Sequence, residues 1–251
     1  MFSGELKHIQ TLRLENETSD LLDFTSIIVT RDGSELLAIS VNEEESSADF
    51  VTLALQPTGG GRYNILQATI NPMLGPNGQP LVISEAPNRL RGFRGDLLAV
   101  CSEPLIDSPI PRVNPTADIY SGGVYNDRDG IRRFFVESTG GYQPSAVAQL
   151  RNGDIMIAFV RGGDVEDEAR SLRIGYVTAD ELREDIASGG TLNPLIIADF
   201  QRNDGFNIAV QSGLAVREDN EGRVFVYSMS DDFFTLLTTF EWRPKRRRHR
   251  R

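Results

Sequence analysis

Two adjacent carboxylates, Asp231 and Asp232, lie between a predicted β-strand at 224–230 and another at 233–242. All-β folds tend to place their chemistry on loops at strand ends, where a rigid scaffold positions it. The pair could ligate a cation or orient a water molecule, because carboxylate oxygens are good ligands for hard cations. The alternative is a structural turn in which one carboxylate caps backbone N–H groups. Adjacent strand residues point to opposite faces, which favours the structural interpretation.

Two acidic residues elsewhere in the chain could complete a carboxylate cluster around this pair. Asp204 and Glu103 would join Asp231 and Asp232 as catalytic groups, with Asp231 and Asp204 as the metal ligands. The expected cofactor is Ca²⁺ or another divalent cation, because hard cations bind carboxylate and carbonyl oxygens without needing histidine. Taken singly, Asp204 and Glu103 are also typical of solvated loop residues.

Three arginines are candidates for holding a phosphate group of a substrate. Arg161 follows a predicted apolar strand, and Arg89 and Arg91 lie close to Arg94 in an irregular basic segment. Guanidinium groups bind phosphate oxygens through two parallel hydrogen bonds. A small-molecule or phosphoester ligand is therefore a candidate partner, and ordinary surface pairing is the alternative role for these arginines.

Several classes of chemistry are excluded by what the sequence lacks. His8 and His249 are the two histidines, one near each end, which argues against a Ser-His-Asp triad and excludes an HExxH zinc site. Cys101 is the single cysteine, so neither an intrachain disulfide nor a cysteine zinc site can form. The sequence contains no G-x-S-x-G elbow, phosphate-binding P-loop or dinucleotide fingerprint. EF-hand spacing also fails around Gly130 and Gly222.

Short apolar segments separated by turn glycines predict an all-β fold. The turn glycines are Gly33, Gly78, Gly130, Gly153 and Gly222. Strand–turn–strand units that recur over roughly 40 residues favour a β-propeller. At about 42 residues per blade, this length predicts about six blades. One helix is expected at 178–188, with Thr178 and Glu181 forming a capping box.

The charge is distributed unevenly along the chain. The net charge is −10, but 243–251 holds seven Lys and Arg residues, which leaves 19 basic and 36 acidic residues in the remainder. An acidic body argues against nucleic acid as its partner. The N-terminal segment lacks the apolar core of a signal peptide, and no run is long enough for a transmembrane helix. The oligomeric state does not follow from the sequence.

The order of motifs along the chain resembles the esterase-like phytase family, and the resemblance covers most of the chain. The matching segments are Gly141–Pro144, Gly153–Ile157, Leu172–Ser188, Ser212–Val216 and Ser230–Phe234. The resemblance implies one phytase-like propeller domain at 1–242, followed by a basic tail at 243–251. It also implies a phosphoester or ester hydrolase, and export to the periplasm or the extracellular space.

The chain departs from the family pattern at acidic positions. Ser212 stands where the family has Glu before its "GLAV" strand, and Val160-Arg161 lacks the usual carboxylate. Two hypotheses therefore stay open. One is a metal-assisted hydrolase, in which the metal activates water and offsets phosphate charge. The other is a non-catalytic propeller that binds a ligand or protein. Convergence of Asp204, Asp231, Glu103 and Arg161 on one pocket would favour the hydrolase.

Overall fold

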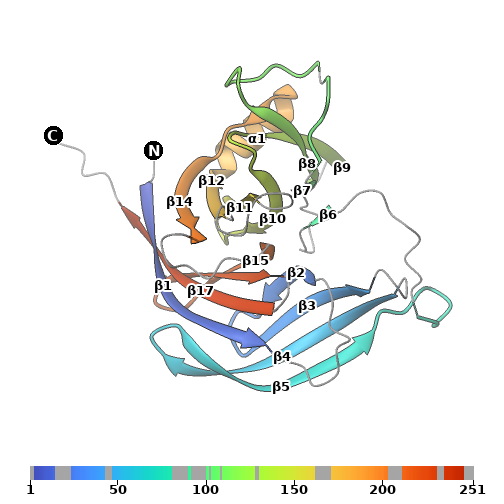
Figure 1. The fold of residues 1–251 in the computed structure, drawn as a ribbon, viewed down its shortest axis with the longest axis vertical. Helices are drawn as coiled ribbons and strands as arrows, with labels where there is room; N and C mark the ends of the chain where they lie inside the picture. Colours follow the sequence, from blue (N-terminus) through green and yellow to red (C-terminus); the bar gives the residue numbers. More distant parts are fainter. Residues whose placement is uncertain are drawn as a thin grey trace.

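The computed structural model describes residues 3–14, 24–42, 47–80, 90–91, 100–101, 103–107, 109–127, 130–161, 171–202, 211–230 and 235–245. Within these ranges the chain is mostly β-strand and has one helix (Figure 1). That helix, α1 (Ala179–Ser188), begins after Thr178 with the predicted capping box and ends at Gly189, whose φ is 67°. The all-β prediction and the predicted helix are confirmed. No described helix has the length and apolar character needed to cross a membrane.

Three four-stranded antiparallel sheets make up most of the structure. The N-terminal sheet has the order β2-β3-β4-β5, the middle sheet β10-β11-β12-β14, and the closing sheet β1-β17-β16-β15. The strands of the N-terminal sheet are β2 (Phe24–Val29), β3 (Glu35–Asn42), β4 (Ser47–Gly59) and β5 (Arg62–Pro72). Those of the middle sheet are β10 (Gln143–Gln149), β11 (Ile155–Arg161), β12 (Ser171–Val177) and β14 (Leu195–Gln201).

The closing sheet joins the two ends of the sequence. Its strands are β15 (Gln211–Glu218), β16 (Val224–Ser230), β17 (Thr235–Lys245) and β1 (Ser3–Leu14). β1 lies beside β17 in antiparallel register, with Leu6 opposite Trp242 (Figure 1). β17 ends at Lys245, and the predicted domain boundary at 242 stays a prediction.

The remaining strands form two smaller sheets. β8 (Asp118–Asp127) and β9 (Gly130–Ser138) form a hairpin, and β13 (Thr191–Leu192), which lies between α1 and β14 in the sequence, adds to β9 in parallel. β6 (Leu90–Arg91) and β7 (Val100–Cys101) form a separate short pair.

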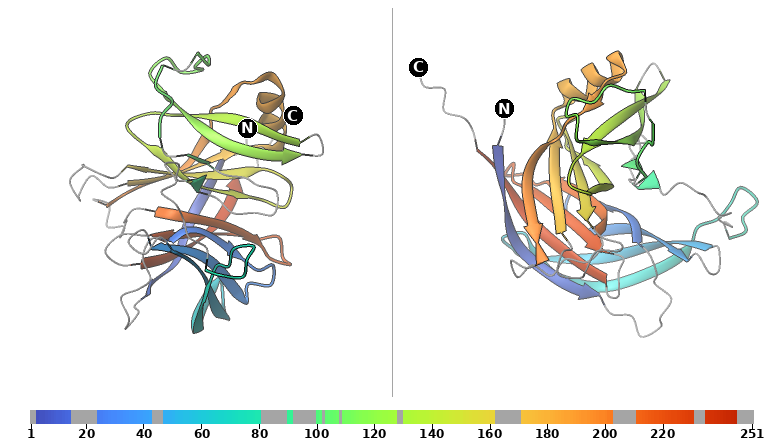
Figure 2. Two further views of the ribbon diagram at one scale, coloured as in Figure 1. Left: turned by 90° about the vertical axis from the view of Figure 1, so that its right-hand side faces the viewer. Right: turned by 45° about the horizontal axis from the view of Figure 1, so that its top comes forward.

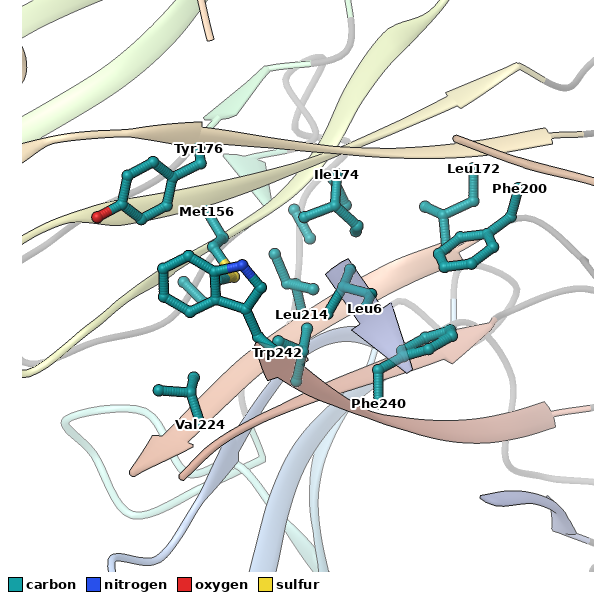
Figure 3. Packing of buried hydrophobic residues seen from close by; sticks show 14 of the residues in the cluster. Leu6, Met156, Leu172, Ile174, Tyr176, Phe200, Leu214, Val224, Phe240 and Trp242 are labelled. Atoms are coloured by element: carbon teal, nitrogen blue, oxygen red, sulfur yellow. The ribbon is translucent and has the colours of Figure 1, made fainter. Parts of the chain in front are cut away.

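Three hydrophobic clusters hold the sheets face to face. In the left view of Figure 2, the N-terminal sheet, the closing sheet, the middle sheet and the β8–β9 hairpin follow one another as layers. Side chains alternate between the two faces of a strand. In β16, Val224 (Figure 3) and Val226 accordingly belong to the cluster shared with the middle sheet, while Phe225 and Tyr227 belong to the cluster shared with the N-terminal sheet. Because both faces are covered, every residue of β16 is buried.

The predicted propeller with about six blades is not confirmed. Among the described residues the sheets are open, and none of them has the form of a closed or propeller-like assembly. The sequence does place the hairpins correctly, because Gly33, Gly153 and Gly222 all lie in turns between paired strands.

Candidate functional site

Three hairpin turns share one backbone geometry. The N–H of Gly33 donates to the carbonyl of Thr30 at 2.9 Å, Gly153 to Leu150 at 3.0 Å, and Gly222 to Asp219 at 3.1 Å. The three glycines have φ of 75°, 92° and 75°. This left-handed region is costly for residues with a Cβ, so each turn requires glycine at this position.

The three turns follow β2, β10 and β15, which are edge strands of their sheets. β15 packs against both β2 and β10. Ser212, near the start of β15, donates its hydroxyl hydrogen to the carbonyl of Phe24 at the start of β2. Glu218, at the end of β15, accepts a hydrogen bond from the backbone N–H of Arg151, which follows β10. The ends of the three strands therefore meet at one edge of the layered sheets.

A cavity of about 270 Å³ lies where these three strand ends meet. It is lined by residues 27–29, Arg31, residues 148–151 and residues 214–218. Ile27, Leu214 and Ala215 are buried and provide apolar walls. Arg31 and Arg151 are exposed, so the charged part of the lining faces solvent. This mixture of apolar walls and a few polar groups is typical of a small-molecule site.

Arg217 is held in place by its neighbours. Its Nε donates to the hydroxyl oxygen of Tyr227 at 3.1 Å, and its guanidinium lies 4.9 Å from the centre of the Phe225 ring. A Cβ placed on Gly33 would lie 2.9 Å from Cζ of Arg217, so the guanidinium also contacts the β2–β3 turn. Burial raises the pKa of Tyr227, although its hydrogen bond to Arg217 acts in the opposite direction. Tyr227 is therefore neutral when it accepts from Arg217.

Arg31 and Arg151 are not held in this way. Within the described part of the chain, no ion pair or hydrogen bond joins either guanidinium to a carboxylate. The carboxylate that lines the cavity belongs to Glu218, and its Oε1 lies 2.9 Å from the backbone nitrogen of Arg151. The described residues that line the cavity therefore include three arginines and one glutamate. This arrangement can bind an anion in an otherwise acidic protein.

The β2–β3 turn also holds a well-hydrogen-bonded carboxylate beside a second cavity of about 460 Å³. Oδ1 of Asp32 accepts hydrogen bonds from Thr30 Oγ1 at 2.8 Å, Ser34 Oγ at 2.8 Å and Ser34 N at 3.1 Å. These bonds, led by the one from the backbone of Ser34, lower the pKa of Asp32 from 3.8 to about 2. Arg31 lines this cavity as well as the first one.

The Asp32 carboxyl group is expected to titrate near pH 2 in the folded protein. A lowered pKa contributes stability that is present above pH 3.8 and is lost as the pH falls toward 2. A ¹³C NMR titration of the side-chain carboxyl carbon measures this directly. Asp219, whose pKa is also lowered within its own turn, is the matched reference. A midpoint for Asp32 near 3.8 would contradict the expectation.

Of the residues that the sequence predicts as a site, Glu103 and Arg161 have described side chains, and neither lines this cavity. Asp231, Asp232, Asp204 and Arg89 lie outside the described residues, as does the side chain of Arg91. Glu103 is exposed in the segment after β7. Arg161 is exposed at the end of β11, whose Val160 pairs with Gln143 at the start of β10. Arg161 therefore lies at the opposite end of the middle sheet from the cavity.

A metal site is not visible in the described part of the chain, where no three His, Cys, Asp or Glu side chains form a group. The proposed Ca²⁺ ligands Asp231 and Asp204 both fall outside that part, so the calcium site stays a prediction. Comparison with known proteins found no matching family model and no matching curated protein. The resemblance to esterase-like phytases likewise stays a prediction from the order of motifs.

Sequence reasoning missed the three arginines that line the cavity. A local signal was present, because Arg31 and Arg151 each directly precede the Asp-Gly or Asn-Gly of a tight turn. Arg217 shortly precedes the third turn, which ends at Gly222. What the local pattern could not indicate is that the three turns lie together. That follows only from the packing of β15 against β2 and β10.

Proposed function

We propose that the protein is a non-catalytic all-β binding module whose ligand lies in the cavity between the ends of β2, β10 and β15. The observation that carries this proposal is the composition of that cavity. Three separate sheets contribute to it, with buried apolar walls from Ile27, Leu214 and Ala215 and three arginines. A site assembled from rigid strand ends holds a ligand with little rearrangement.

We also propose that the sheets are arranged as the blades of a β-propeller. In a propeller, sheets surround an axis with their first strands innermost, and an N-terminal strand often completes the last sheet. Three features support this arrangement here. The N-terminal and middle sheets follow chain order. β15 packs against β2 and β10, the first strands of those two sheets. β1 completes the sheet formed by β15, β16 and β17. The cavity would then lie at one end of the axis.

Ligand titration tests the binding function. A panel of succinate, butyrate, 1,4-butanediol, 1,4-diaminobutane and benzyl alcohol covers both signs of charge and both aliphatic and aromatic character. At least one compound is expected to give saturable NMR shifts at residues 27–31, 148–151 and 214–218. Val216→Trp, which places a large ring in the lining, is expected to abolish these shifts, whereas Val113→Trp on an exposed loop leaves them unchanged. Absence of saturable shifts with every compound would reject the function.

Metal-assisted hydrolysis is the second candidate function, because β15 begins and β16 ends beside the predicted acidic segments in the sequence. Gln211 pairs with Ser230, and the predicted ligands Asp204 and Asp231 belong to the sequence segments directly before Gln211 and directly after Ser230, outside the described residues. A calcium-dependent hydrolase would release phosphate or p-nitrophenol from its ester, and Asp231→Ala would reduce that release by about 100-fold or more. Lack of release at high protein concentration, with and without Ca²⁺, would reject the hydrolase.

A further inference from the structure

We infer that the ligand of this cavity is a short aliphatic dicarboxylate, an inference that rests on the proposed binding function. The described residues that line the cavity include three arginines, Arg31, Arg151 and Arg217, and one acidic residue, Glu218. A guanidinium is planar and binds a carboxylate through two parallel N–H···O bonds. The cavity therefore selects an anion in a protein whose net charge is −10.

The order of the strands favours an anionic group at each end of the ligand. Arg31 follows β2 and Arg151 follows β10, while β15 packs against both of these strands and carries Arg217. The two outer arginines thus come from opposite sides of β15. A ligand with one carboxylate at each end can reach both of them, whereas a single carboxylate can occupy the fork of only one.

The three arginines differ in how far they are ordered before a ligand binds. Arg217 is already fixed by Tyr227 and by the Phe225 ring. A preordered group loses little side-chain entropy on binding, so Arg217 provides a fixed positive charge in the lining. Arg31 and Arg151 are exposed and have no carboxylate partner among the described residues, so both can turn toward the two ends of the ligand.

The size of the cavity and its walls limit the ligand to a few carbon atoms. Its volume of about 270 Å³ lies just below the range of drug-sized ligand sites, which begins at about 300 Å³. Ile27, Leu214 and Ala215 present apolar surface that suits the methylene groups between two carboxylates. A chain of two or three methylene groups fits these conditions better than a long or aromatic body.

Glu218 provides an internal test of the charge of the ligand. Its carboxylate lines the same cavity and repels a second carboxylate. Glu218→Gln removes this charge and keeps an oxygen that can accept from the backbone N–H of Arg151. The substitution is expected to strengthen succinate binding about threefold to tenfold, whereas it would leave a neutral ligand unaffected.

Calorimetric titration of the full chain with malonate, succinate, glutarate and adipate tests the inference. Affinity is expected to peak at succinate or glutarate, and butyrate is expected to bind at least tenfold more weakly. Arg31→Ala and Arg151→Ala should each weaken succinate binding about tenfold, and Arg151→Lys should do so by less. Arg183→Ala, which removes an exposed arginine of α1, is the matched control and should leave affinity unchanged.

Different experimental outcomes would reject the dicarboxylate ligand and the binding function on which it rests. Equal binding of butyrate and succinate, stronger binding of inorganic phosphate than of succinate, or full affinity in both arginine variants would overturn the dicarboxylate inference. Saturable binding of 1,4-butanediol or benzyl alcohol in the same cavity would then leave the binding module intact. Melting temperatures close to that of the parent protein establish that the exposed arginine variants are folded.

Discussion

Phe240→Ala is expected to lower the free energy of unfolding by about 4 kcal/mol. Phe240 lies on β17 and is 3% exposed, within the cluster that joins the closing sheet to the middle sheet (Figure 3). Its ring stacks on Phe200 of β14, with centroids 4.9 Å apart and an interplanar angle of 17°. Truncation removes a large apolar side chain and leaves a cavity between two sheets. The cavity stays largely unfilled, because the backbones of the two sheets cannot move together to close it.

Urea denaturation monitored by circular dichroism measures this loss. Ile106→Ala is the control, because that side chain is 84% exposed and its removal should change stability by less than about 0.5 kcal/mol. A double-mutant cycle with Phe200→Ala should give a coupling free energy of about 1 kcal/mol. If Phe240→Ala and Ile106→Ala have similar effects, the stacked pair does not hold the two sheets together.

Local patterns in the sequence were sufficient to predict the individual strands, turns and helix. Turn glycines such as Gly153 mark hairpins because few other residues adopt their φ. The capping box of Thr178 and Glu181 marks the start of α1 for a similarly local reason. The alternation along 224–230 predicts a strand, and the structure adds that both of its faces are buried.

The arrangement of the sheets could not be predicted in this way, because it depends on contacts between residues far apart in the sequence. The pairing of Leu6 with Trp242 is one example, since nothing near either residue specifies the other. The meeting of Arg31 and Arg151 at one cavity is another, because it depends on how β15 packs between β2 and β10. Sequence reasoning instead chose acidic residues, and Asp231 and Asp204 lie outside the described ranges.

Asp154→Ala is expected to lower the free energy of unfolding by about 3 kcal/mol. The Asp154 side chain is buried and links three elements. Its Oδ1 accepts from the backbone N–H of Ala179 at the start of α1, at 2.8 Å, and its Oδ2 accepts from Asn152 Nδ2 at 2.6 Å. Oδ2 also accepts from the hydroxyl of Tyr176 on β12. Burial first, and then this hydrogen bond, raises the pKa of Tyr176.

The loss is large because the substitution leaves buried donors without an acceptor. The hydroxyl of Tyr176 and the N–H of Ala179 would both lose their partner, and α1 would lose a negative charge at its positive end. Asp154→Asn keeps one acceptor oxygen but places a donor near the amide of Asn152, so it should cost about half as much. Asp180→Ala is the control, because that side chain is 92% exposed and should contribute less than about 1 kcal/mol.

Amide hydrogen exchange distinguishes the loss of the Asp154 hydrogen bonds from a general loss of packing. Loss of the Asp154 carboxylate should expose the amide of Ala179 and the turn that carries Arg151, while amides of the N-terminal sheet change only through global stability. Weaker succinate binding should accompany the faster exchange, because Asn152 directly follows Arg151 in the turn. Equal stability losses for Asp154→Ala and Asp180→Ala would show that the buried carboxylate does not connect the β10–β11 turn to α1.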